Sequence, residues 1–267
     1  MDLVQAFVLG VVQGMAEFLP VSSSGHLVLV PAAFGWSEPS IGFDVMLHLA
    51  TLVAVVGYFR RDLVLLIRAF FSRRSDLAAE RKLAWLIIAA TIPTGIIGLA
   101  FDDFFTSLFS NVTAVGVFLL LTAAILALSE MLSRKALHDP SGMKWSHAIA
   151  IGLAQGMAIA PGISRSGATM AAGLGVGLDR EQAARFSFLL SVPIILLVGA
   201  KTGLDVALHG GALPSPAVCI VGFLAAAISG YAVIAGLLSW LRRRSLLVFS
   251  VYCAVLGTAV LVWQIIA

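Results

Sequence analysis

Long apolar segments separated by short polar stretches dominate this sequence. A helix needs about 20 residues to cross the hydrocarbon core of a bilayer. Six segments have roughly that length, near residues 43–59, 83–101, 111–132, 185–204, 216–240 and 246–266. Two more apolar stretches are interrupted in their middle by proline, serine and glycine, near residues 5–35 and 146–175. The pattern predicts an all-α polytopic membrane protein with six transmembrane helices and two broken pairs of short helices.

The first broken stretch predicts a re-entrant helix hairpin. Gln13 and Glu17 are four residues apart and share one face of a helix, which Pro20 ends because proline cannot donate the next backbone hydrogen bond. Serine and glycine at 22–25 are N-cap and turn residues, and the apolar run from Leu27 predicts a second short helix starting there. Each helix has about a dozen residues, too few to span a bilayer. A turn at membrane depth requires surrounding protein or a polar cavity.

The chain repeats itself at an offset of 142 residues. GVVQGMA at 10–16 recurs as GLAQGMA at 152–158. SSSG at 22–25 recurs as SRSG at 164–167. The second broken stretch is therefore expected to form a second re-entrant hairpin.

Each half then contains one hairpin and three spans. Because three is odd, the second half lies upside down in the membrane relative to the first. We expect a single membrane domain over 1–267, built from inverted-topology repeats at about 1–133 and 143–267. In transporters, broken helices of such repeats meet at a substrate site near the bilayer midplane.

Composition and charge support this class and set an orientation. With 60% hydrophobic and 12% charged residues and a mean hydropathy of +1.02, the chain is not a soluble domain. The net charge of +3 does not indicate nucleic-acid binding, because the basic residues lie in short clusters between spans. The clusters are Arg60, Arg61, Arg68, Arg73, Arg74, Arg81 and Lys82; Arg134, Lys135 and Lys144; Arg180 and Arg185; and Arg242, Arg243 and Arg244. If the first cluster is cytoplasmic, alternation makes all of them cytoplasmic, and both termini face outward.

The second broken stretch carries an arginine, Arg165, in the middle of apolar sequence. Its planar, permanently charged guanidinium matches phosphate oxygens, and a helix beginning near Gly167 would direct free N–H groups at the same anion. The small and polar neighbours expected to contact a phosphate are Ser164, Ser166, Gly167 and Thr169. Alternatively, Arg165 pairs with Glu17 across the repeat interface. Pairing at rest and phosphate binding during turnover are compatible.

The first broken stretch offers a nucleophile and a base. Ser23 and His26 are three residues apart around the glycine turn, within reach of a hydrogen bond from hydroxyl to imidazole. An imidazole can take the serine proton and later protonate a leaving oxygen. The neighbours expected to contact phosphate are Ser22, Ser24 and Gly25.

Glu17 either orients His26, holds a divalent cation, or does both. One carboxylate beside the Gln13 amide is a poor Mg²⁺ site by itself, but substrate phosphates normally supply part of the ligand set. Asp44 and His48 share a helix face near the start of the first span. They either frame the outer mouth of the cavity or form a structural polar pair.

The two motifs together resemble a known family. QGMAEFLPVSSSGH at 13–26 and PGISRSG at 161–167, with the six-span plan, are similar to the bacterial undecaprenyl-diphosphate phosphatases, also called bacitracin-resistance proteins. The resemblance covers essentially the whole chain. It implies removal of the terminal phosphate from a C55 polyprenyl diphosphate, which recycles the lipid carrier of cell-wall synthesis. It also implies the bacterial cytoplasmic (inner) membrane as location. The positive-inside count predicts that the active site faces the periplasm or outside.

The resemblance also assigns residues. The positions that match the family's functional residues are Glu17, Ser22, Ser23, His26 and Arg165. Gln13 stands where members have either Glu or Gln, which weakens a metal site of two carboxylates. The cofactor expected is a divalent cation, Mg²⁺ or Ca²⁺, near Glu17 and Gln13.

Several alternatives remain at this point. Phosphatidate-type membrane phosphatases have a nucleophilic His after their SR motif, but here no His follows Arg165 until His209. The nucleophile is therefore Ser23, which we prefer, or His26. The rival function is a transporter or flippase of the polyprenyl phosphate lipid. The expected partners are the lipid substrate and membrane lipids, not nucleic acid, and a homodimer stays open.

Overall fold

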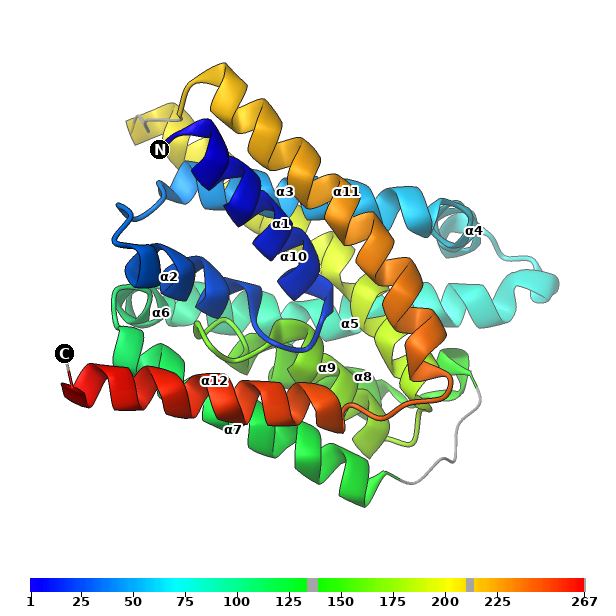
Figure 1. Cartoon of the computed structure of the whole chain (residues 1–267). Helices are drawn as coiled ribbons and strands as arrows, with labels where there is room; N and C mark the ends of the chain where they lie inside the picture. Colours follow the sequence, from blue (N-terminus) through cyan, green and yellow to red (C-terminus); the bar gives the residue numbers. More distant parts are fainter. Residues whose placement is uncertain (134–138, 210–213, 267) are drawn as a thin grey trace.

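The computed structural model describes residues 1–133, 139–209 and 214–266. The secondary structure in these ranges consists of α-helices and two short 3₁₀ turns (Figure 1). Six of them are long and apolar enough to cross a membrane. They are α3 (Ile41–Tyr58), α5 (Ala78–Ala100), α7 (Val112–Leu132), α10 (Arg180–His209), α11 (Pro216–Leu241) and α12 (Leu247–Ile266). The all-α membrane class and the six spans are thus confirmed. Arg134 and Lys135, from the second predicted basic cluster, lie outside the described residues.

Two pairs of short helices complete the core of the fold. The first pair is α1 (Leu3–Phe18) and α2 (Ser23–Phe34), and the second is α8 (Trp145–Met157) and α9 (Arg165–Gly175). The longest of these four, α1, has 16 residues, so none reaches the length of a span. The breaks fall where Pro20 and the second loop predicted them. The re-entrant course of the two pairs through a bilayer stays a prediction.

Both second helices begin earlier than the sequence pattern predicted. Helix α2 begins at Ser23 rather than near Leu27, because the Ser22 side chain accepts a hydrogen bond from the Gly25 N–H and caps the helix. Helix α9 begins at Arg165 rather than near Gly167, since Ser164 caps it in the same way through the Gly167 N–H. The predicted N-cap in the first serine stretch is thus confirmed at Ser22, whereas Ser23 and Ser24 lie in the first turn of α2 rather than in a turn before it.

The first helix of each short pair packs against a long helix of the other half. Helix α1 lies along α11, and α8 lies along α5. The remaining long helices also pair between halves, α3 with α10 and α7 with α12. Each of these four contacts joins a helix that precedes residue 133 to a helix that follows residue 143. The inverted orientation of the halves in a membrane stays a prediction.

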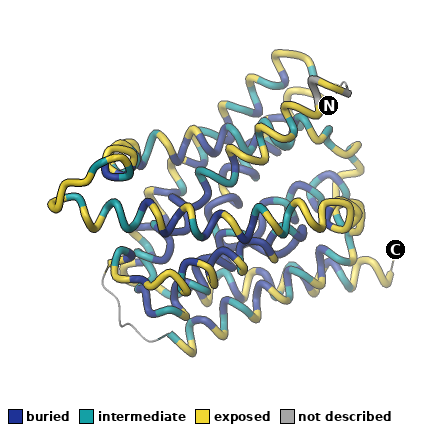
Figure 2. The backbone as a smooth tube through the Cα atoms, turned by 180° about the vertical axis from the view of Figure 1, so that it is seen from behind, coloured by how far each residue is buried: buried dark blue, intermediate teal, exposed yellow. Residues whose placement is uncertain are grey.

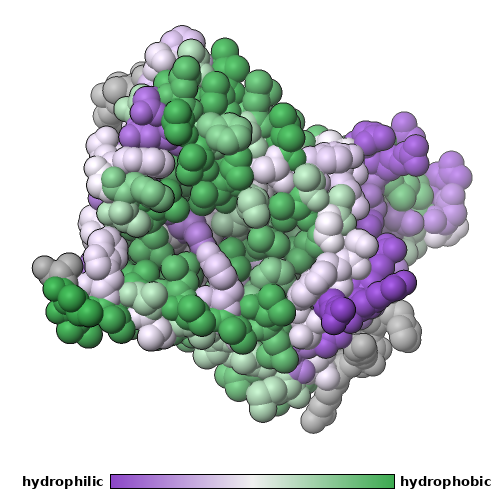
Figure 3. All heavy atoms as spheres, in the orientation of Figure 1, coloured by the Kyte–Doolittle hydropathy of each residue, from purple (hydrophilic) through white to green (hydrophobic). Residues whose placement is uncertain are grey.

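The two ends of the bundle differ in charge. Both termini lie at one end, and the basic loops after α3 and α11 lie at the other (Figure 1). Hydrophilic residues gather at that second end, whereas the flank between the ends is mostly apolar (Figure 3). The shorter helices at the ends, missed by the sequence pattern, are α4 (Arg60–Phe71), α6 (Asp102–Leu108), and the 3₁₀ turns η1 (Ser75–Leu77) and η2 (Pro140–Gly142).

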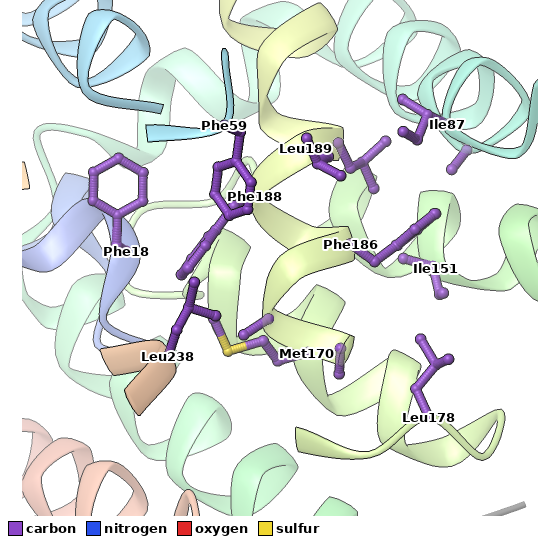
Figure 4. Packing of buried hydrophobic residues seen from close by; sticks show 14 of the residues in the cluster. Phe18, Phe59, Ile87, Ile151, Met170, Leu178, Phe186, Phe188, Leu189 and Leu238 are labelled. Atoms are coloured by element: carbon purple, nitrogen blue, oxygen red, sulfur yellow. The ribbon is translucent and has the colours of Figure 1, made fainter. Parts of the chain in front are cut away.

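Buried residues concentrate along the middle of the bundle (Figure 2). The largest apolar cluster joins side chains from both halves around three phenylalanines (Figure 4). Phe18 at the end of α1 meets Phe188 of α10 edge to face, with ring centroids 5.3 Å apart, and Phe59 lies 6.3 Å from Phe188. Because Phe18 is fully buried, this contact fixes the last turn of α1 and with it the neighbouring residue Glu17.

The close contacts of α1 with α11 and of α8 with α5 depend on glycine. A Cβ on Gly14 of α1 would lie 2.5 Å from the Ala226 carbonyl oxygen of α11. A Cβ on Gly152 of α8 would overlap the Ala90 carbonyl oxygen of α5. Small residues let helix backbones approach closely in membranes, where packing rather than the hydrophobic effect holds helices together.

We therefore expect Gly152→Ala to destabilise the protein by about 1–3 kcal/mol, the usual cost of overpacking, since the obstacle is backbone. The matched control is Gly95→Ala in α5, where an added Cβ meets nothing within 4 Å. That change should be neutral or stabilising by up to about 1 kcal/mol. Denaturant unfolding of the purified protein in detergent measures both. Equal stability of the two variants would contradict the close approach.

Candidate active site

The two helix breaks meet inside the bundle and are joined by hydrogen bonds. The Gly162 N–H donates to Ser22 Oγ at 3.0 Å, and Ser166 Oγ donates to the Leu19 carbonyl at 2.9 Å. Thr122 of α7 supports the second loop, because its hydroxyl donates to the Gly162 carbonyl at 2.9 Å and accepts from the Ser164 N–H at 3.1 Å. The predicted meeting of the two motifs is therefore present, and α7 braces it.

Ser22 holds this junction in a constrained conformation. Its φ of 72° lies in the region that favours glycine, which costs a non-glycine residue about 1–3 kcal/mol. The surroundings fix it on several sides: its Oγ accepts from Gly25 and Gly162, and its carbonyl accepts from the N–H of His26. Ser22 thus joins the loops in this structure, and its predicted phosphate contact stays a prediction.

Glu17 is the centre of the site. Its side chain is only 5% exposed. Oε2 accepts hydrogen bonds from Gln13 Nε2 at 3.0 Å and from Ser23 Oγ at 2.6 Å. Oε1 accepts from Arg165 Nη2 at 2.6 Å. Each carboxylate oxygen is therefore engaged, and the residues that engage them come from both broken pairs.

Arg165 closes the site from the second loop. Its side chain is 15% exposed, and besides the ion pair with Glu17 its Nη1 donates to the Ser187 carbonyl of α10 at 3.2 Å. A guanidinium has five N–H donors. Two are used by these contacts, so three are left for an anion. Pairing with Glu17 therefore leaves Arg165 with donors for an anion, and its binding of a phosphate stays a prediction.

His26 differs from its predicted role as the partner of Ser23. Its Nδ1 lies 2.7 Å from the Ser22 carbonyl, so Nδ1 carries the proton. In the neutral ring Nε2 then accepts a hydrogen bond from the Tyr252 hydroxyl of α12, at 2.7 Å. Because both ring nitrogens are engaged and Ser23 Oγ donates to Glu17, the expected hydrogen bond from Ser23 to His26 does not form in the described structure.

Two site residues were not assigned to the catalytic cluster from the sequence. His48 of α3 places Nε2 3.6 Å from Glu17 Oε2, while its Nδ1 bonds to the Asp44 carbonyl at 2.8 Å. The spacing of Asp44 and His48 on one helix face was a usable signal, because polar pairs are rare in an apolar span. Tyr252 gave no such signal, since a single tyrosine in a membrane helix is unremarkable by sequence.

The two helix starts face the site with free donors. In the described chain the N–H groups of Ser23 and Ser24 at the start of α2, and of Arg165 and Ser166 at the start of α9, have no hydrogen-bond acceptor. Helix N-termini attract anions through such groups and through the helix dipole. Both N-termini lie beside Glu17, because Ser23 and Arg165 each donate a hydrogen bond to its carboxylate, and phosphate binding there stays a prediction.

The other predicted phosphate contacts are used within the protein. Ser164 Oγ lies 3.2 Å from Ser166 Oγ, and Ser24 Oγ lies 3.3 Å from Ser22 Oγ. Thr169 is 1% exposed and bonds to the Arg165 carbonyl and to Ser187 Oγ. The hydroxyls therefore stabilise the helix starts, and the N–H groups of Gly25 and Gly167 donate to the capping hydroxyls of Ser22 and Ser164.

The residues present provide few ligands for a metal ion. Among the described residues no group of three His, Cys, Asp or Glu side chains could hold one. Gln13 does offer a carbonyl oxygen, Oε1, that is buried without a hydrogen-bond partner, and Glu17 is its neighbour. Such a pair fits a cation whose other ligands are substrate phosphates and water.

Comparison with known proteins gives one consistent result. A family model described as "Bacitracin resistance protein BacA" matches residues 6–259. The chain is 41% identical to the protein named Undecaprenyl-diphosphatase of Methanosphaera stadtmanae, over 100% of this chain and 99% of that protein. It is 44% identical to the Undecaprenyl-diphosphatase of Halothermothrix orenii, over 98% of each chain. The Undecaprenyl-diphosphatase of Myxococcus xanthus is 42% identical, over 98% of this chain and 89% of that protein.

The buried ion pair yields a stability prediction. Glu17→Gln or Arg165→Met alone should cost about 3–5 kcal/mol, because each leaves one buried charge without its partner. The double variant should lose clearly less than the sum of the two single losses. Denaturant unfolding in detergent provides the double-mutant cycle.

The control for this cycle is the pair of Arg242 and Glu181, in which the arginine side chain is 64% exposed. Arg242→Met should cost no more than about 1 kcal/mol. Additive losses for Glu17 and Arg165 would show that the two charges do not stabilise each other.

Proposed function

This chain belongs to the family described as bacitracin resistance protein BacA, and from that membership we infer that it is an undecaprenyl-diphosphatase. It is a membrane-embedded hydrolase that converts undecaprenyl diphosphate to the monophosphate and inorganic phosphate. The activity recycles the lipid carrier of peptidoglycan synthesis and confers resistance to bacitracin. One observation supports this reaction above the others: a buried serine hydroxyl donates to a carboxylate that is clamped by an arginine.

We propose that Ser23 is the nucleophile and that Glu17 accepts its proton. In the first step Ser23 Oγ attacks the terminal phosphorus, and the bond from that phosphorus to the bridging oxygen breaks. The Ser23 proton passes to Glu17 Oε2, which lies 2.6 Å away, and the polyprenyl monophosphate leaves. This assignment replaces His26 by Glu17 as the base for Ser23, since the hydrogen bond of Ser23 is directed at Glu17.

His26 then serves the second step. A water molecule attacks the phosphorus of phosphorylated Ser23 and gives a proton to His26 Nε2, the bond from Ser23 Oγ to phosphorus breaks, and Ser23 takes its proton back from Glu17. Inorganic phosphate then leaves, and His26 releases its proton to phosphate or water. The Nδ1 hydrogen bond to the Ser22 carbonyl leaves Nε2 as the basic nitrogen. In the resting protein Tyr252 holds that nitrogen, so Tyr252 is a positioning residue for His26.

Arg165 and the two helix starts carry the electrostatic part of the reaction. Phosphoryl transfer needs mainly positioning and stabilisation of charge on the transferred group. The three remaining donors of Arg165 and the free N–H groups of α2 and α9 are of the right kind for its equatorial oxygens. Burial strengthens these interactions, because Glu17 and Arg165 are shielded from water.

We further propose that a divalent cation, Mg²⁺ or Ca²⁺, joins the site together with the diphosphate. Gln13 Oε1 and Glu17 would be its protein ligands, and substrate oxygens would complete the set. When bound, the cation would offset negative charge on the diphosphate. Every proton transfer described above uses side chains of this chain alone.

Access and assembly follow from the same geometry. We propose that the diphosphate reaches the site from the end that carries both termini, which the positive-inside rule places outside the cytoplasmic membrane. The prenyl tail stays among the lipids. A homodimer, which the sequence left open, is not needed for this chemistry, since every residue named comes from one chain. A transporter or flippase is not favoured, because a carrier needs no hydroxyl paired with a base.

The test of this function is phosphate release from C55 polyprenyl diphosphate by the purified protein in detergent. Arg165→Ala should lower the turnover number by roughly 10³ to 10⁵, as for comparable arginines in phosphoryl transfer. Ser23→Ala should release no phosphate above background, and chelation of divalent cations should lower the wild-type rate. Ser107→Ala, an exposed serine of α6, is the control and should keep full activity. If His26→Ala released no phosphate while Ser23→Ala stayed active, His26 would instead be the nucleophile.

Tyr252→Phe tests the positioning of His26. The substitution keeps the ring stacked on His26, at a centroid distance of 5.8 Å, and removes only the hydroxyl. We expect kcat to fall about tenfold with KM unchanged. The hydroxyl supports only part of the roughly 10²–10⁴-fold rate increase that acid–base catalysis contributes. In a His26→Gln background the same substitution should have no further effect.

Tyr231→Phe on α11 is the matched control, because Tyr231 and Tyr252 are both 45% exposed. It should leave kcat unchanged. An equal loss from Tyr252→Phe with and without His26 would mean that Tyr252 acts by some route other than His26.

A further inference from the structure

Helix α4 has a surface that the phosphatase site does not use. It follows α3 directly after the fully buried Phe59 and lies across the basic end of the bundle, where Figure 1 shows it end on. Its sequence, RRDLVLLIRAFF, divides into three faces at 100° per residue. One face packs on the protein through Leu66 and Ala69, which are 7% and 0% exposed.

The second face of α4 begins with Arg60 and is otherwise apolar and uncovered. Val64, Ile67 and Phe71 follow one another at helical spacing and are 47%, 60% and 80% exposed. Three large side chains on one stripe exceed the scattered apolar residues of an ordinary soluble surface. In a membrane protein such a stripe lies against acyl chains.

The third face of α4 is cationic. Arg61 and Arg68 are seven residues apart, lie on the same side of the helix beside the apolar stripe, and are exposed. Neither has an ion-pair partner among the described residues, whereas other arginines at this end do: Arg74 pairs with Asp76 and Arg185 with Asp62. The Arg185 contact also neutralises Asp62, the only acidic residue of α4.

We propose that this exposed side of α4 is a docking surface for an anionic phospholipid of the bilayer. The phosphate would bind between Arg61 and Arg68, and an acyl chain would lie along Val64, Ile67 and Phe71. A helix with an apolar face and an arginine face lies in the plane of the membrane interface. Charge complementarity selects an anionic headgroup over a zwitterionic one, since the two arginines have no other counterion within the described chain.

Lipid binding to the purified protein tests this surface. Dioleoyl phosphatidylglycerol or dioleoyl phosphatidylcholine is titrated into the protein in a nonionic detergent, and bound lipids are counted by native mass spectrometry. The wild type should bind the anionic lipid more tightly than the zwitterionic one. Arg61→Gln with Arg68→Gln should weaken the binding of phosphatidylglycerol by roughly ten- to thirtyfold, from about 1 kcal/mol per basic residue near a membrane surface.

The matched control is Arg243→Gln with Arg244→Gln, which removes two exposed charges from another loop at the same end. It should retain wild-type lipid preference. Phe71→Ser should weaken both lipids, while inorganic phosphate should not compete, because the acyl contact is part of the site. Phosphate release by the α4 variant should stay within about twofold of wild type, which shows an intact fold. An equal loss of phosphatidylglycerol binding in the Arg243 and Arg244 variant, or no such loss in the Arg61 and Arg68 variant, would overturn the proposal.

Discussion

The free energy of a buried charge governs this structure. A carboxylate that is only 5% exposed is stable only when it is paired. Glu17 pairs with Arg165, which lies in a loop 148 residues further along the chain. That contact requires both helix breaks to reach the same point inside the bundle. Close helix crossings at Gly14 and Gly152 and the hydrogen bonds of Ser22 and Ser166 hold them there. Packing of helices from one half against helices of the other thus brings two opposite charges together away from water.

Serine hydroxyls in this interior mostly stabilise helix starts, whereas several backbone N–H groups at those starts have no acceptor among the described residues. The hydroxyls of Ser22 and Ser164 cap α2 and α9, while the first N–H groups of those helices have no acceptor within the described chain. A serine-rich loop is therefore not simply a set of hydroxyls offered to phosphate. Ser23 is the exception, since its hydroxyl donates to the carboxylate of Glu17.

Much of this could be predicted from the sequence, because length and hydropathy decide which segments span a bilayer and Pro20 decides where α1 ends. The recurrence of the two motifs also predicted which loops meet. Side-chain pairing within the site could not be predicted, since the three-residue spacing of Ser23 and His26 allowed a bond that Glu17 and Tyr252 prevent. Partners such as Tyr252 come from distant helices, and their contact depends on packing that no local pattern encodes.

The recurrence of the two motifs has a further consequence for how such a protein could be rebuilt. At an offset of 142 residues, Arg165 occupies the place of Ser23, Ile159 that of Glu17 and Ala168 that of His26. At these positions the first motif supplies a carboxylate, a hydroxyl and an imidazole, and the second supplies the guanidinium that pairs with that carboxylate. A chain made of two first halves would bring two carboxylates together without a cation, and two second halves would bring two arginines together without a nucleophile. The two motifs are therefore not interchangeable, because each provides the charge that the other lacks.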